Sequence, residues 1–168
     1  MAETILSTVL VGFVLVSTLQ IVGPIVQSTS VHADRLVAAN LANQLAEEIA
    51  TKVFTDPQVD AIDAIGVDDA ERAANRTDFD DVDDYHGWSS SPPKISSDQT
   101  NFALGLWTRS VKVVHVELND AQTVSATNTG LKRVTVVVSK NGVELAKVES
   151  LHSKSADTLG FVVKAGGG

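Results

Sequence analysis

The chain has 168 residues, a mass of 17.7 kDa and a formal net charge of −8. This length is enough to bury one sizeable core, and the negative charge argues against a nucleic-acid-binding surface. The sequence contains no cysteine, which excludes disulfide scaffolds, thiolate metal sites and cysteine nucleophiles. The acidic charge is concentrated in residues 56–101, which hold twelve acids against three bases.

The N-terminal segment is almost entirely apolar. Residues 4–31 contain no Asp, Glu, Lys or Arg, and the stretch 5–26 is interrupted only by Ser, Thr, Gln20, Gly and Pro. A helix that is apolar on all sides must be buried in protein or in a membrane, and about 20 apolar residues span a bilayer. We therefore expect residues 1–30 to form a transmembrane or filament-core helix. Gly23-Pro24 predicts lost helical hydrogen bonds upstream of or around Pro24.

Helical periodicity continues beyond the apolar run. Apolar residues recur every four positions from Val37 to Val53, and polar residues occupy the opposite face, which predicts an amphipathic helix. Asp56-Pro57 should stop it. The two halves together predict one helix over residues 5–54, roughly 75 Å long at about 1.5 Å per residue for fifty residues. A compact domain of this size cannot bury such a length, so the apolar half should protrude.

The rest of the chain predicts an acidic loop followed by strands. The acidic segment 57–106 contains a possible helical turn at 68–74 and the turn-rich stretch DFDDVDDYHGWSSSPPK. Alternating apolar residues predict strands at 107–118, 131–140 and 143–153, with a last strand at 158–164. Asn141-Gly142 between two of them is a strong hairpin signal. The expected fold class is α+β, in which the amphipathic half-helix packs on an antiparallel sheet of three or four strands within a head of residues 31–168.

The sequence ETILSTVLVGFVLVSTLQIVGP resembles the N-terminal helix of the type IV pilin and pseudopilin superfamily. FDDVDDYHGW (79–88) and the strand sequences WTRSVKVVHV and LKRVTVVVSKNG resemble pilin-like proteins of the mannose-sensitive-haemagglutinin type and related pseudopilins. The resemblance implies a structural subunit that is held in the inner membrane, meets a pilus or secretion assembly machinery, and polymerises into an extracellular helical filament.

The resemblance also implies roles for five residues. Glu3 matches the family's acidic residue, which pairs with an N-terminal amine, here that of Met1. Gly12, Gly23 and Pro24 match its helix breakers. Glu3 capping the helix N-terminus at a membrane surface is the alternative, and Met1 can be an initiator or a processed N-terminus.

Other interpretations of the N-terminal segment stay open. A minor pseudopilin of a type II secretion system and a single-span anchor for an extracytoplasmic binding module both require the same apolar helix. A cleaved secretory signal is disfavoured, because the segment before the apolar run lacks Lys and Arg and the run is too long.

The acidic loop poses a separate question of metal binding. Five aspartates within seven residues offer the oxygen ligands that Ca²⁺ prefers, but their spacing does not match an EF-hand loop. The favoured alternative is a structural turn in which the carboxylates accept hydrogen bonds from backbone amides. The five residues are Asp78, Asp80, Asp81, Asp83 and Asp84.

No catalytic constellation is evident. The four histidines are not at metal-ligand spacing, and His115 is expected to be a sheet residue. Nucleophile-elbow, P-loop and dinucleotide-binding motifs do not occur. We expect no enzyme activity and no cofactor apart from the calcium alternative. Trp88 and Trp107 are expected to be core or loop anchors.

Overall fold

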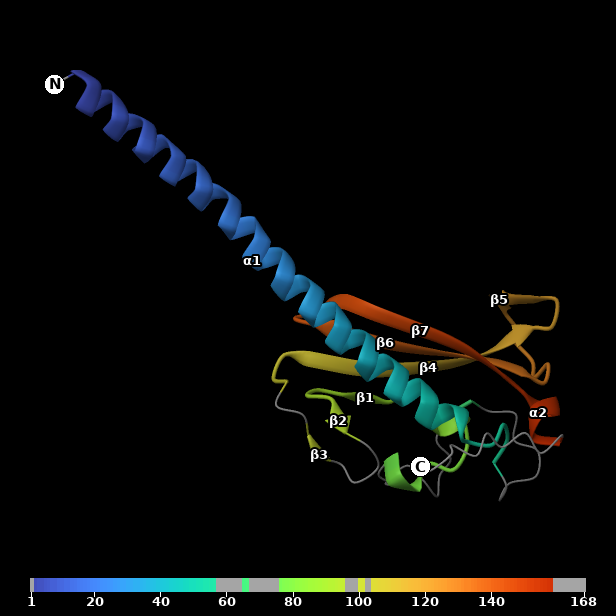
Figure 1. Cartoon of the computed structure of the whole chain (residues 1–168). Coiled ribbons are helices and arrows are strands. Elements are labelled where there is room, and N and C mark those ends of the chain that lie inside the picture. The colour runs from blue at the N-terminus through green and yellow to red at the C-terminus, as the bar shows by residue number, and fades with distance from the viewer. Residues whose placement is uncertain (1, 57–64, 67–75, 96–99, 102–103, 159–168) are drawn as a thin grey trace, which may run out of the picture. The chain divides into compact units, whose positions relative to one another are not determined.

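The computed structural model describes residues 2–56, 65–66, 76–95, 100–101 and 104–158, without the side chains of residues 18–29, 95, 100–101 and 157–158. The chain divides into two compact units, Met1–Val37 and Ala38–Gly168, each described by itself. The fold is α+β, as expected, with one long helix and an antiparallel sheet (Figure 1). Its elements are α1 (Ala2–Ala50), η1 (Arg76–Asp78), η2 (Asp83–Tyr85), β1 (Ser89–Ser90), β2 (Lys94–Ile95), β3 (Thr100–Asn101), β4 (Trp107–Glu117), β5 (Asp120–Val124), β6 (Leu131–Lys140), β7 (Val143–Ser153) and α2 (Lys154–Thr158).

The main sheet has five strands in the order β1-β4-β6-β7, with β5 paired to β4, and all pairs are antiparallel. The strands expected at 131–140 and 143–153 are confirmed residue for residue, and the one expected at 107–118 ends one residue earlier. Asn141 and Gly142 both have positive φ, 53° and 76°, as a two-residue hairpin turn of the primed type requires. Buried residues alternate with more exposed ones along β4 and β6, because one face of the sheet is buried.

The core of the head lies between the second half of α1 and this buried face. Ala38, Leu41, Ala42, Leu45 and Ile49 recur at helical spacing and are at most 4 % exposed. They belong to one cluster with the inward-facing valines of β4 and β6, which alternate along each strand. The expected packing of an amphipathic half-helix on the sheet is thus confirmed.

The helix ends earlier than its periodicity predicts. It stops at Ala50, not at residue 54. The backbone amides of Thr51 and Lys52 then donate hydrogen bonds to the carbonyls of Glu48 and Ile49, three residues earlier, which forms tighter turns. Val53 then forms a parallel bridge with Asp81, and its carbonyl accepts the Val82 amide at 3.1 Å. Tertiary pairing with the acidic loop outweighs helical propensity here, so Val53 is half exposed instead of continuing the apolar row.

Two further differences concern strands. The expected three or four strands understate the sheet, because β1 and β5 each pair with β4. β5 contains two residues of low strand propensity, Asp120 and Ala121, and the Asp120 carboxylate accepts bonds from the Gln122 amide and the Thr123 hydroxyl. The last strand, expected at 158–164, is wrong at Thr158, which belongs to α2; Ser153 caps that helix through the Ser155 amide. Residues 159–164 and the turn expected at 68–74 lie outside the described residues.

Candidate functional site

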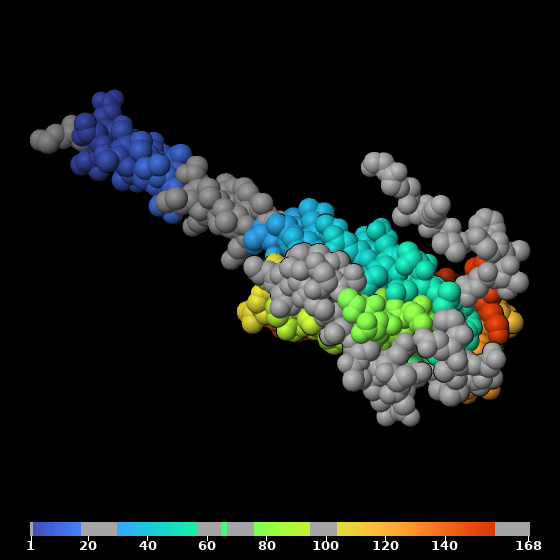
Figure 2. Space-filling view, turned by 90° about the horizontal axis from the view of Figure 1, so that it is seen from below, coloured from blue at the N-terminus to red at the C-terminus, as the bar shows by residue number. Residues whose placement is uncertain are grey.

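The first candidate site is the apolar half of α1. Nine large apolar side chains between residues 5 and 16, in the segment drawn in blue in Figure 2, are each 56–74 % exposed. Ser7 and Thr8 interrupt these residues and Ser17 follows them. Each hydroxyl donates a hydrogen bond to a carbonyl one turn earlier: Ser7 to Glu3 and Ser17 to Phe13, both at 2.8 Å, and Thr8 to Thr4. These three hydroxyls form their hydrogen bonds within the helix, so apolar material can cover them without leaving these donors unpaired. The nine side chains are Ile5, Leu6, Val9, Leu10, Val11, Phe13, Val14, Leu15 and Val16.

The predicted assembly residues lie along this helix. Glu3 is exposed in the first turn of α1, where the helix dipole favours a negative charge. Met1, its expected partner, lies outside the described residues. Gly12 lies inside the helix, and a Cβ added there would meet nothing within 4 Å beyond its chain neighbours and the backbone of the helix itself. The Glu3–Met1 pairing therefore stays a prediction.

The predicted loss of helical hydrogen bonds at Gly23-Pro24 is limited to the one bond that proline cannot donate, and the helix is not broken there. α1 runs from Ala2 to Ala50 without interruption, so the pair lies in continuous helix. Pro24 lacks an amide hydrogen and therefore cannot donate one helical hydrogen bond, but this loss does not end the helix. The side chains of these two residues are not described.

The expected membrane span at residues 5–26 lies partly among the undescribed side chains of 18–29. Within the described part of the chain, no helix is both long and apolar enough to cross a membrane.

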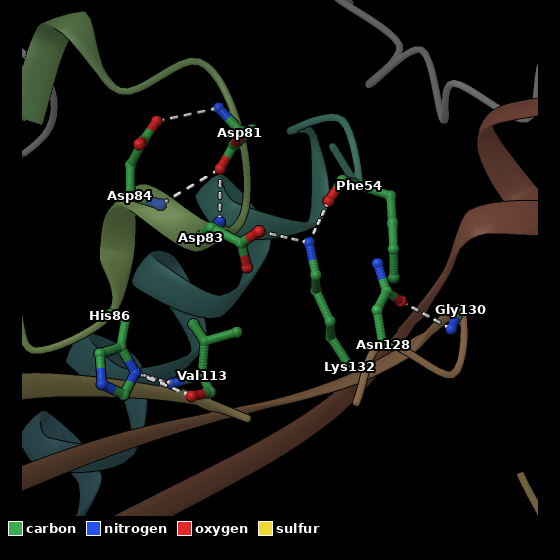
Figure 3. Close-up of polar contacts among 9 residues, drawn as sticks. All are labelled: Phe54, Asp81, Asp83, Asp84, His86, Val113, Asn128, Gly130 and Lys132. Carbon is green, nitrogen blue, oxygen red and sulfur yellow. Dashed lines mark hydrogen bonds and ion pairs between the residues drawn. The ribbon is translucent and has the colours of Figure 1, made fainter. Parts of the chain in front are cut away.

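The second candidate site is the acidic loop, in which aspartate carboxylates accept hydrogen bonds from backbone amides of the same loop (Figure 3). One oxygen of Asp84 accepts the amides of Asp80 and Asp81 at 3.0 and 3.1 Å. One oxygen of Asp81 accepts the amides of Asp83 and Asp84 at 2.5 and 3.2 Å. The predicted structural turn with carboxylates bonded to loop amides is therefore confirmed.

The five aspartates do not form a single cation site. Asp80, Asp81 and Asp84 come together, with one oxygen from each lying within 4.8 Å of the others, and these three are the residues that could hold a cation. Asp83 instead pairs with a lysine, and exposed Asp78 accepts a bond from the neighbouring Thr77 hydroxyl. Asp78 and Asp83, the other two residues of the predicted calcium set, do not belong to this group, and calcium binding stays a prediction.

The Asp83 carboxylate lies in the interior of the head. Its Oδ2 is 2.6 Å from the Lys132 ammonium, which also donates to the Phe54 carbonyl and lies 4.0 Å from the centre of the Phe54 ring (Figure 3). Lys132 is 1 % exposed. One lysine thus ties together the sheet, the acidic loop and the chain that leaves α1. Beside it on β4 lies His115, which is buried and pairs with Lys132 in the sheet register, as expected of a sheet residue.

Burial sets the protonation of these carboxyl groups. It raises the pKa of Asp81 to about 7, and the negative charges of Asp84 and Asp83 raise this pKa further. The hydrogen bonds that the Asp81 carboxylate accepts from the backbone amides of Asp84 and Asp83 lower it in part. Burial also raises the pKa of Asp83, although Lys132 opposes the shift. The loop therefore holds carboxyl groups whose charge is costly and whose proton uptake lies closer to neutral pH than usual.

A second buried base fixes the helix to the sheet. Arg109 on β4 is 2 % exposed and donates to the carbonyl of Leu41 at 3.1 Å and to that of Lys94. Its guanidinium carbon lies 5.7 Å from the centre of the Trp88 ring, and that of Arg76 lies 4.9 Å from it. Burial lowers the pKa of Arg109 to about 10, helped by the charge of Arg76.

Glu48 completes this arrangement from α1. Its Oε1 lies 3.1 Å from Nε of Arg76 and accepts the Tyr85 hydroxyl at 2.9 Å. The expected anchor roles of the two tryptophans are confirmed, since Trp107 is buried and Trp88 packs against the core. Sequence patterns did not reveal the basic side of these contacts, because Arg109 and Lys132 occupy inward positions of strands whose other inward residues are mostly apolar.

Among the described residues, one serine hydroxyl meets a histidine ring: Oγ of Ser150 lies 3.2 Å from Nε2 of His152 on β7. Comparisons with protein-family models, with curated proteins and with solved structures found no match for this chain.

Proposed function

We propose that this protein is a structural subunit of a type IV pilus-like extracellular filament, polymerising through its N-terminal apolar helix. One observation carries the proposal: a single continuous helix, α1, exposes large apolar side chains over residues 5–16 and packs on a sheet in its second half. The arrangement of one long helix followed by an antiparallel sheet is also what the resemblance to pilins and pseudopilins implies.

The exposed apolar surface requires a partner. Full burial of a large apolar side chain contributes roughly 1.5–3 kcal/mol. Nine such side chains, each more than half exposed, make burial favourable by on the order of 10 kcal/mol before the cost of association. The partner is a bundle of identical helices in the filament, and the apolar core of the inner membrane before assembly.

Glu3 gives the bundle its axial register. A carboxylate inside an apolar bundle is costly unless it is paired, and residues 4–31 offer no basic side chain. The N-terminal amine of Met1, on the same or a neighbouring subunit, is the partner that we propose. An inner-membrane assembly machinery, of the pilus or secretion kind, then extracts subunits into the filament.

A filament test uses one substitution on each half of α1. Purified full-length protein in detergent would be diluted below the critical micelle concentration, and fibres counted by negative-stain electron microscopy. Phe13→Asp places a charge on the apolar half and should abolish fibres. Asn43→Asp, on the exposed face of the second half, is the matched control and should assemble as wild type does.

Tryptophan fluorescence would verify that the heads stay folded, since Trp88 and Trp107 both lie there. Fibres from Phe13→Asp at the wild-type yield would contradict the proposal. Long fibres in native cell-surface preparations would separate a major filament subunit from the two alternatives, a minor pseudopilin and an anchored binding module.

A further inference from the structure

Among the residues that the structure describes, the last strand of the sheet has one edge that pairs with no other strand. β7 pairs with β6 on one side, and it has no second strand neighbour among the described residues. It is eleven residues long and contains no proline. A long edge strand presents unpaired backbone donors and acceptors and is a ready template for another strand.

The side chains of β7 alternate between the two faces of the sheet. Ala146, Val148 and Ser150 lie opposite the inward valines of β6, whereas Lys147 and Glu149 lie opposite its outward residues. Nζ of Lys147 is 2.8 Å from Oε1 of Glu149 in the same strand, and both side chains remain substantially exposed.

We propose that the free edge of β7 binds the β7 edge of a second copy of this chain, antiparallel and centred on Val148. The sequence VELAKVESLHS is self-complementary about that residue. A two-fold axis through Val148 places Lys147 of each copy opposite Glu149 of the other. It also places Ala146 opposite Ser150, so that small side chains meet on the inward face.

Charge excludes the neighbouring registers. A continuous sheet requires that residues directly opposite each other lie on the same face. Centring the pair on Lys147 or on Glu149 would set like charges directly opposite, which is destabilising. Centring it on Ala146 or Ser150 would leave both charged residues opposite apolar or uncharged ones. Only the Val148 register matches each charge with its opposite.

The charged residues therefore serve two purposes. Charges on an edge strand discourage pairing with unrelated strands, and here they permit one specific partner. Because the interface is isologous, it closes into a dimer of heads and does not propagate. The proposal does not depend on the filament, but in filaments it would join heads of two different fibres side by side.

Charge reversal tests the dimer in the full-length protein in detergent, by sedimentation velocity. Lys147→Glu and Glu149→Lys should each weaken self-association at least tenfold. The double variant Lys147→Glu/Glu149→Lys should restore it to within about threefold of wild type. An equimolar mixture of the two single variants should also dimerise, because one copy then carries two acids at positions 147 and 149 and the other carries two bases there.

The mixture separates the contact between copies from the ion pair within one strand. That internal pair stays broken in each single variant, so dimers in the mixture arise only from the interface. Single variants that associate as wild type does, or a mixture that stays monomeric, would overturn the proposal.

Disulfide capture tests the register, because the chain has no native cysteine. Val148→Cys lies on the two-fold axis and should cross-link to itself under mild oxidation. Leu151→Cys, on the same strand and exposed, is the control: its two copies would be about 20 Å apart at roughly 3.3 Å per residue and should not cross-link.

A second capture experiment guards against a damaged Val148 variant. Ala146→Cys mixed with Ser150→Cys should give a heterodisulfide, whereas neither alone should give a homodisulfide at a comparable rate. Equal cross-linking by Leu151→Cys and Val148→Cys would refute the register.

Discussion

Replacing Lys132 by methionine removes the charge that compensates Asp83 while keeping most of the side-chain volume. In the native head the ammonium is 2.6 Å from the Asp83 carboxylate and also serves the Phe54 carbonyl. The variant leaves a buried carboxylate without its ion-pair partner. Breaking a buried pair by removing one partner typically costs about 3–5 kcal/mol. This is a large part of the roughly 5–15 kcal/mol by which domains are stable.

The loss should depend on pH in a direction that the structure dictates. Burial already raises the pKa of Asp83, and Lys132 lowers it, so the variant raises that pKa further. A raised folded-state pKa means that the folded state binds a proton that the unfolded state releases, so stability falls as pH rises through that pKa. The destabilisation of Lys132→Met should therefore be largest at pH 8 and shrink toward pH 5.

Urea unfolding followed by tryptophan fluorescence would measure both effects, because the two tryptophans lie in the head. The control is the double variant Asp83→Asn/Lys132→Met, in which no charge remains unpaired; it should recover a substantial part of the loss and show a weaker pH dependence. A cost below about 1 kcal/mol for Lys132→Met at pH 8, or a cost that grows on acidification, would refute the reasoning.

Three further outcomes are expected. Burial raises the pKa of Asp81 to about 7, so its contribution to stability is present at low pH and lost as pH rises through 7; Asp81→Asn should raise Tm at pH 8, with the gain shrinking toward pH 4, and equal melts at both pH values would contradict this. Arg109→Lys loses a carbonyl bond to Leu41 or Lys94 and should cost about 1.5–3 kcal/mol in urea titrations, whereas an unchanged midpoint would show that lysine reaches both carbonyls. Gly142→Ala forces alanine to a φ of 76° and should cost about 1–2 kcal/mol, whereas Gly12→Ala in open helix should leave head unfolding unchanged.

The regular elements could be predicted because their causes are local. The apolar row from Leu41 to Ile49 and the alternating valines of β4 and β6 each have the period of their element. Asn141-Gly142 supplies the positive φ values of the hairpin. β5 and the early end of α1 could not be predicted in this way, because pairing with β4 and with Asp81 decides them, and periodicity does not reveal such pairing.

The polar contacts of the site were only half predictable. Carboxylates bonded to nearby amides follow from aspartates spaced two to four residues apart. The partners Lys132 and Arg109 come from strands far along the chain, and periodicity alone does not say which carboxylate meets which base. A signal was nevertheless present: both bases share the inward parity of the valines that follow them, at Val134 and Val111.

The two hydrogen bonds that Lys132 donates, to the Phe54 carbonyl and the Asp83 carboxylate, also bear on the order in which the head folds. These two bonds join residues 78 and 49 positions apart in sequence, whereas the α1 helix and the β6–β7 hairpin are held by short-range bonds. Contacts between distant residues require closure of long loops, and their entropy cost delays them. The helix and the hairpin can thus form first, and the acidic loop locks onto both afterwards. Interactions that form after the transition state govern the unfolding rate more than the folding rate. We therefore expect the contacts of Lys132 to slow the unfolding of the head more than they speed its folding.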